Sequence, residues 1–107
     1  MPRGSRCTAS RGSSIASRVL PRRGCASLRD QLERASSSIV LNIAEGCGRF
    51  AQAEKAHFYL IARGSAMECV AVFNLALSRG LVGPPVYRKA RGLLVRLVTQ
   101  LSQRMQA

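Results

Sequence analysis

Apolar residues between positions 27 and 45 recur every three or four residues, which is the spacing of one face of an α-helix. We expect this helix to begin with Ser27 as its N-cap and to end at Ala44 or Glu45, with Gly46 as the stop. Its apolar face is predicted to contain Leu28, Leu32, Ala35, Ile39 and Ile43.

A second, longer pattern is apolar on nearly every side. It predicts a helix that begins near 51–53, ends at Ser78 or Arg79, and is followed by Gly80. A helix of this kind is buried on more than one side, so we expect it to contact a second subunit as well as the core. One stripe holds Ile61, Ser65, Val72 and Leu75, and the opposite side holds Tyr59, Met67, Val70, Phe73 and Leu77.

The last amphipathic segment follows Pro84 and Pro85, which break the chain and can occupy the first turn of a new helix. Its apolar residues cover an arc of roughly 140° at 100° per residue, as in an ordinary bundle helix. A helix lying on a membrane surface is the less common source of such a pattern. The arc contains Ala90, Leu93, Leu94, Leu97, Val98, Leu101 and Met105.

The start of the chain, residues 1–19, has no comparable pattern. It is rich in Arg, Ser and Gly, a composition typical of disorder, and a short helix over 15–20 would stop at Pro21. Organellar transit peptides share the Arg and Ser content, but this segment lacks a long apolar face. We therefore expect one helical domain over 20–107, preceded by a disordered segment or a remnant of a first helix.

Two motifs carry small and acidic residues where a plain core helix would carry Leu. The first is SIVLNIAEG over 38–46, followed by Gly48 and Arg49, and the second is IARGSAME over 61–68. They resemble the 23S rRNA intervening-sequence protein family, whose members read close to S-I-P-x-N-I-A-E-G-x-G-R and I-A-x-G-S-x-x-E. Val40 stands where many members carry Pro. The matching positions include Asn42, Glu45, Gly46, Gly48, Arg49, Gly64, Ser65 and Glu68.

The resemblance covers about residues 20–105 and includes the sequence QLERA over 31–35. It implies an all-α fold, an antiparallel up-down four-helix bundle. Residues 1–19 depart from the long first helix of the family, so that helix is expected to be shortened, degenerate or missing here. The remaining helices would leave an apolar groove. Either residues 13–20 fill it in part, or another subunit fills it, or the start of the reading frame is degenerate.

The same resemblance leads to an expectation about function. It implies a non-enzymatic protein without a cofactor that forms a homo-oligomer, and ring-like pentamers are known in the family. Some members are encoded within intervening sequences of rRNA genes. The related accessory proteins of diversity-generating retroelements are basic bundles that engage nucleic acid and a reverse transcriptase.

The charge of the chain supports a polyanionic partner. The chain contains 17 Lys and Arg residues and 5 Asp and Glu residues, which gives a net charge of +12. A basic surface attracts RNA or DNA, whereas few aromatic residues are available to stack on bases. The expected function is therefore an oligomeric adaptor that contacts phosphates with weak sequence specificity; the alternative is a structural or protein-interaction module whose charge is incidental. The candidate contacts are Arg22, Arg23, Arg29, Arg34, Arg49, Lys55, Arg63, Arg88, Lys89, Arg91 and Arg96.

Metal and membrane sites are not expected. The cysteines at positions 7, 25, 47 and 69 stand singly, without a C-x-x-C pair, so we expect no metal site and free thiols in a reducing cytoplasm. Cys69 and Cys47 are candidates for small core residues. No run of 18 apolar residues is present, which predicts that nothing spans a membrane.

Catalysis is also not expected. His57, the only histidine, could lie near Glu54 and Glu68 on one helix, where an internal network of polar contacts is a commoner arrangement than an acid–base pair. Gly46 to Arg49 lacks the lysine and glycine spacing of a phosphate-binding loop and is interpreted as a turn.

The acidic motif residues require a separate explanation, because a carboxylate within an apolar face must be paired. We hypothesise that Asn42, Glu45 and Glu68 form a polar cluster that determines helix register or subunit geometry. Arg34, Arg49 and Ser65 are possible partners. Gly64 is expected to allow a close approach between helices.

Overall fold

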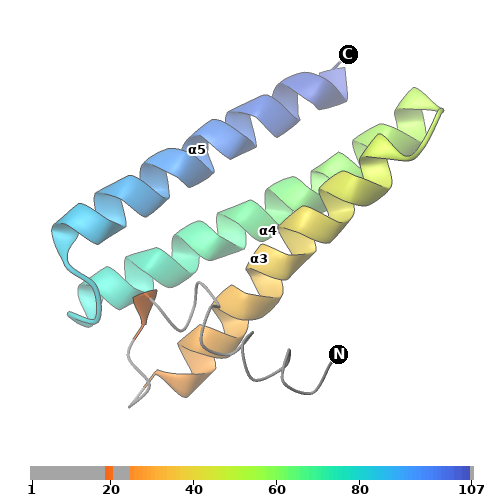
Figure 1. Cartoon of the computed structure of the whole chain (residues 1–107). Coiled ribbons are helices and arrows are strands. Elements are labelled where there is room, and N and C mark those ends of the chain that lie inside the picture. The colour runs from red at the N-terminus through yellow and green to blue at the C-terminus, as the bar shows by residue number, and fades with distance from the viewer. Residues whose placement is uncertain (1–18, 21–24, 107) are drawn as a thin grey trace, which may run out of the picture.

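The computed structural model describes residues 19–20 and 25–106, and this part of the chain is helical, without strands. It contains helices α3 (Ala26–Cys47), α4 (Gln52–Ser78) and α5 (Pro84–Gln106), which run up, down and up (Figure 1). The predicted all-α class is confirmed. Helices α3 and α5 each pack along α4 and scarcely touch each other. The central helix therefore organises the fold, and the side between α3 and α5 is open.

The core lies along the apolar face predicted for α3. The stripe predicted for α4 is buried only in part, because Ser65 and Val72 are buried whereas Ile61 and Leu75 are 39% and 44% exposed. Leu28, Leu32, Ala35 and Ile39 of α3 are buried against Cys69, Val72 and Phe73 of α4 in one cluster, which Tyr87, Leu94 and Val98 of α5 extend. Tyr59, Ala62 and Leu101 form a second cluster toward the other end. Both clusters include α4, so this helix supplies the floor of the whole core.

The boundaries of α3 differ from the prediction. Cys25, not Ser27, is the N-cap residue, and the helix continues through Gly46 to Cys47. The helix does not end at Gly46. A Cβ atom at this position would lie 2.5 Å from Cε1 of Tyr59, so the close packing of the two helices requires a glycine here. The glycine lets α3 approach α4 closely, and Gly48 instead takes the C-cap position.

The turn from α4 to α5 confirms the glycine and proline signals. Gly80 has φ +73°, the left-handed conformation that glycine adopts without steric penalty. Its N–H donates to the carbonyl of Leu77 at 3.0 Å, and the N–H of Leu81 donates to the carbonyl of Ala76 at 2.8 Å. This is a Schellman motif, and the new helix then begins at Pro84, where no N–H is needed.

Helix α4 is apolar on its outer side as well as in the core, as its pattern indicates. Leu60, Met67 and Leu75 are 50%, 54% and 44% exposed. Among the described helices, α4 alone has the length and apolar composition needed to cross a membrane. The absence of a run of 18 apolar residues therefore did not exclude such a helix. Central bundle helices share this property, and polar side chains join α4 to both of its neighbours.

The predictions for the first helix fall almost entirely outside the described residues. Val19 and Leu20 are the exceptions: Leu20 is buried in the main core cluster and Val19 packs against it. These two residues therefore pack against the bundle beside α3 and α5.

Candidate nucleic-acid interface

Helix α5 is the most unbalanced element in charge. It carries Arg88, Lys89, Arg91, Arg96 and Arg104 and contains no Asp or Glu. Its apolar stripe packs toward α4, which leaves these cations at exposed positions. None of the first four forms a hydrogen bond or an ion pair with the described part of the chain. They are therefore available to an anionic ligand.

Their spacing makes α5 a continuous basic surface. Arg88 and Arg91 are one turn apart on the outer side, while Lys89 and Arg96 are two turns apart on a neighbouring stripe. At a rise of 1.5 Å per residue the set spans about 12 Å. Duplex DNA carries one phosphate per about 1.7 Å of its axis, so this length faces several phosphates.

Arg79 extends the basic surface and was missing from the candidates chosen by sequence. It is the exposed C-cap residue of α4, just before the turn that leads into α5. Arg104 was missed as well; it lines a hollow with Gln100 and Leu97 near the other end of α5. A count of cations outside the family motifs would have found both.

Three of the predicted contacts instead hold the fold together. Arg49 pairs with Glu45 at 3.0 Å and lies 5.0 Å from the centre of the Phe58 ring. Lys55 Nζ donates to the carbonyls of Gly46 and Cys47, where a cation also suits the negative end of the α3 dipole.

Arg63 is also engaged within the fold. Its Nη1 donates to Ser102 Oγ at 3.1 Å and so joins α4 to α5. This contact leaves Arg63 half-buried and directed toward a neighbouring helix instead of toward solvent.

The cations of α3 are balanced by neighbouring carboxylates. Arg29 is half-buried and Arg34 is exposed, and Asp30 and Glu33 lie between them in the sequence. The candidates at positions 22 and 23 lie outside the described residues. Of the predicted set, the cations of α5 are thus the exposed and uncompensated ones.

The motif residues are arranged differently from the hypothesised cluster. Asn42 Nδ2 donates to the carbonyl of Ser38 at 2.8 Å and to its hydroxyl at 3.1 Å, and Ser65 Oγ donates to Ser38 Oγ at 2.7 Å. Glu45 is exposed and forms an ion pair with Arg49, which was one of its predicted partners. The chain therefore joins Asn42 to Ser65 through Ser38, a residue that the hypothesis left out, and not to the two glutamates.

Glu68 and Gly64 lie on the outer side of α4. Glu68 is exposed and forms no hydrogen bond or ion pair with the described residues. A Cβ atom at Gly64 would have no neighbour within 4 Å, so the expected close approach of helices at this glycine does not occur within one chain. The fold of a single copy explains neither residue.

The histidine is exposed and contacts the edge of the Phe58 ring, with ring centres 5.2 Å apart and planes at 72°. It forms no hydrogen bond or ion pair with Glu54 or Glu68, so the expected polar network around His57 is absent from the described residues. Within residues 19–20 and 25–106, no three His, Cys, Asp or Glu side chains gather as metal ligands would.

The described cysteines are free thiols in two environments. Cys25 and Cys69 are buried, and burial, with a smaller contribution from Glu68, raises the pKa of Cys69 from 9.0 to about 11. Cys47 is exposed, so its predicted place in the core was wrong. Its Sγ lies 3.5 Å from the hydroxyl of Tyr59, and this hydrogen bond, together with burial, raises the pKa of Tyr59.

A comparison with curated proteins gives no match. The sequence does match the family model described as 23S rRNA-intervening sequence protein, over residues 11–103. The match begins at position 11, before the point near position 20 where the motif resemblance begins, and it includes the three described helices almost to the end of α5. The helical fold, the two motifs and this match agree, and the chain belongs to the 23S rRNA-intervening sequence protein family.

Proposed function

We propose that this protein is a basic homo-oligomeric adaptor that binds RNA or DNA through phosphate contacts made by α5. The observation that carries the proposal is the row Arg88, Lys89, Arg91 and Arg96, exposed on one helix without a carboxylate among them. A positive surface of this kind raises the local concentration of polyanions and binds them mainly through release of counterions. The family is not known as an enzyme family, and the proposal requires no chemical step.

The aromatic residues favour contact with phosphates over stacking on bases. Tyr59 and Phe73 are buried, and the hydroxyl of Tyr87 donates to Asn74 Oδ1 at 2.6 Å. Arg49 lies over Phe58, which leaves Phe50, fully exposed after α3, as the aromatic side chain free to stack. One stacking residue at the end of the bundle away from Arg88 and Arg91 gives little sequence readout, so binding should be weakly specific.

The test is a fluorescence polarisation titration with labelled RNA and duplex DNA at several salt concentrations. The double variant Arg88→Gln/Arg91→Gln should weaken binding and reduce the log–log salt slope on duplex DNA by about 1.8, which is about 0.9 for each lost phosphate contact. The control Arg34→Gln removes a charge from an exposed position on α3, outside α5, and should leave the slope nearly unchanged. Equal losses in both variants, or no binding by the wild type at low salt, would refute the role of α5.

The second candidate function is a structural or protein-interaction module without a nucleic-acid ligand. The exposed apolar side of α4 favours it, since no described residue covers Leu60, Met67 and Leu75. Light scattering separates the candidates when it is combined with the titration. An oligomer that binds neither RNA nor DNA at low salt would favour the structural module.

A further inference from the structure

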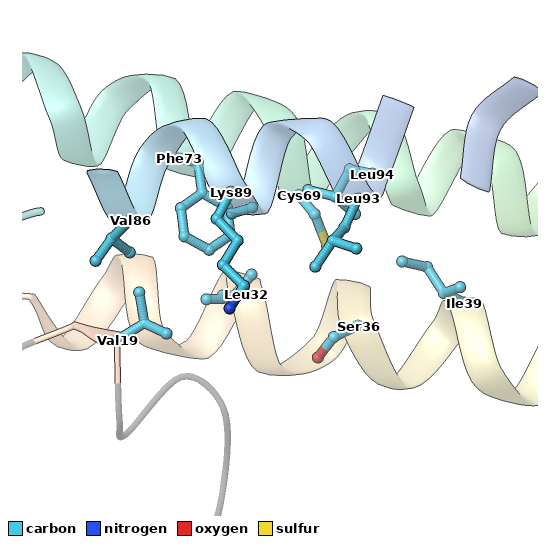
Figure 2. A pocket seen from close by; sticks show the side chains of 11 residues that line it. Val19, Leu32, Ser36, Ile39, Cys69, Phe73, Val86, Lys89, Leu93 and Leu94 are labelled. Carbon is cyan, nitrogen blue, oxygen red and sulfur yellow. The ribbon is translucent and has the colours of Figure 1, made fainter. Parts of the chain in front are cut away.

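The open side between α3 and α5 is an apolar groove of about 340 Å³ (Figure 2). Its floor is formed by Cys69 and Phe73 of α4, and its walls by Leu32 of α3 and Leu93 of α5. Figure 2 shows these side chains directed into the space between the helices, with Lys89 extending from α5 at the rim. The groove lies between α3 and α5, which pack on α4 but scarcely on each other.

The outer side of α4 is a convex apolar surface, which we call the ridge: Leu60, Gly64, Met67, Ala71 and Leu75. These residues are spaced by three or four positions and therefore share one face. The face points away from α3 and α5, because the buried residues of α4 occupy its opposite side. The ridge is narrow at Gly64, which has no side chain, and at Ala71, which has a small one. No described residue lies within 4 Å of a Cβ atom placed at Gly64.

The charges of the two surfaces are complementary. Glu68 is beside the ridge, exposed and without a partner among the described residues. Lys89 stands at the rim of the groove, and Arg96 lies two turns further along the same stripe of α5. Among the described residues no helix covers the groove, which offers cations, and none covers the ridge, which offers a carboxylate.

We infer that the ridge of one copy inserts into the groove of a second copy, with Glu68 of the inserted helix next to Lys89. This inference rests on the homo-oligomer of the proposed function and specifies its interface. Residues 1–18 are a poorer occupant by composition, because Ile15 is their only branched aliphatic residue and they contain no aromatic side chain. A second copy supplies the apolar face and the carboxylate together.

The geometry of this contact determines the type of assembly. Groove and ridge are different surfaces, so the contact is heterologous: every copy that donates its ridge still has a free groove. Such contacts close into a ring when the rotation between copies allows it, and otherwise extend into a filament. A symmetric dimer made of two ridges would instead leave both grooves empty.

The test uses the full chain and measures its mass in solution by size-exclusion chromatography with light scattering. Met67→Glu on the ridge and Leu93→Glu in the groove should each yield monomers. Both side chains are 54% exposed, so helicity by circular dichroism should stay at the wild-type level. The control Leu41→Glu places the same charge at a position that is 64% exposed and lies outside both surfaces, beside Ala44 and Gly48, and it should remain oligomeric.

Mixing the two monomeric variants provides the sharper result. Met67→Glu retains an intact groove and Leu93→Glu retains an intact ridge, so together they should form a one-to-one heterodimer. A wild-type monomer, or an oligomer that Leu93→Glu leaves intact, would overturn the inference; in the second case the groove is vacant or holds residues 1–18 or another protein. Failure of the two variants to pair would overturn it as well.

The same samples separate this inference from nucleic-acid binding. Met67→Glu leaves the cations of α5 unchanged, so its monomer should still bind RNA or DNA at low salt, with reduced avidity. If the wild type is an oligomer but binds neither RNA nor DNA, only the nucleic-acid role is refuted. Retained binding by a protein that is always monomeric would refute the interface alone.

Discussion

At the scale of single residues, Gly46 shows how one contact can require a glycine inside a helix. Its position after Ala44 and Glu45 resembles a C-terminal stop, yet α3 continues through it, and the ring of Tyr59 occupies the space that a side chain would need. Glycine lowers helix stability by roughly 1 kcal/mol relative to alanine. The close packing of α3 on α4 compensates for that loss.

Gly46→Ala should therefore destabilise the protein although alanine is the better helix former. The added methyl group would overlap Cε1 of Tyr59 and force one of the helices to shift, an effect of about 1–3 kcal/mol. Gly92→Ala is the matched control, because a Cβ atom there meets nothing within 4 Å, and this variant should be stabilised by up to about 1 kcal/mol. Urea unfolding followed by circular dichroism measures both, and a stabilised Gly46→Ala would contradict the packing described.

Cys69 gives the stability a dependence on alkaline pH. Its pKa is raised from 9.0 to about 11, so above pH 9 the unfolded chain loses this proton while the folded chain retains it. The folded state then binds more protons than the unfolded state, and stability falls as the pH rises from about 9 to about 11. Below pH 9 the contribution is constant.

Thermal melting between pH 8 and pH 11 should show this fall, and Cys69→Ala should lessen it because the titrating thiol is gone. Tyr59, whose pKa is also raised, adds to the fall at the upper end and remains in the variant. Cys25→Ala serves as the control for loss of a thiol at another buried position. If the melting temperature falls equally with pH in the wild type and in Cys69→Ala, burial does not raise the pKa of the Cys69 thiol.

At the scale of helices, polar contacts determine how α4 sits against each neighbour. Ser65 of α4 bonds to Ser38 of α3, and Arg63 of α4 bonds to Ser102 of α5. Apolar packing alone would allow a helix to slide along another. Each of these bonds between helices can form at only one relative position of the two helices, so they select a single register.

Ser65→Ala should lower the free energy of unfolding by about 1 kcal/mol, the usual net value of a hydrogen bond, less the small gain in helix propensity. Ser37→Ala makes the same chemical change at an exposed serine that has no hydrogen bond, and it should be neutral or slightly stabilising. Chemical denaturation of both variants measures the difference. A neutral Ser65→Ala would mean that packing alone determines the register.

The helices were predictable from sequence because each has a local signal. The apolar face of α3, the left-handed Gly80 and the opening Pro84 depend on residues within a few positions of one another. The pairing of Ser38 with Ser65 was not predictable, since the two residues are 27 positions apart and meet only when α3 packs on α4. The same holds for Gly46 and Tyr59.

The candidate site was predictable in part for the same reason. A run of cations without carboxylates is visible in the sequence of α5, whereas the engagement of Arg63 and Lys55 with backbone and side-chain oxygens depends on the fold. Glu45 and Arg49 are four residues apart at the end of α3, so their ion pair could be named in advance.

At the scale of the whole molecule, a chain with an open groove and an uncovered ridge should gain stability from its own copies. Binding between native copies favours the folded state by mass action, so the melting temperature should rise with protein concentration. Calorimetry over a hundredfold range of concentration tests this for the wild type and for Met67→Glu, whose melting temperature should stay constant. A wild-type melting temperature independent of concentration would contradict assembly in that range.

The central place of α4 also has a consequence for synthesis. A ribosome releases α3 and α4 before α5, so the most apolar helix of the described chain is complete while the helix that covers one of its sides is still unmade. Until α5 has left the ribosome and packed, α4 presents the side later covered by α5 together with its ridge to chaperones and to membranes. A released chain that ends after Gly83 should accordingly be captured or aggregate, whereas the next 23 residues turn the same helix into the centre of a folded bundle.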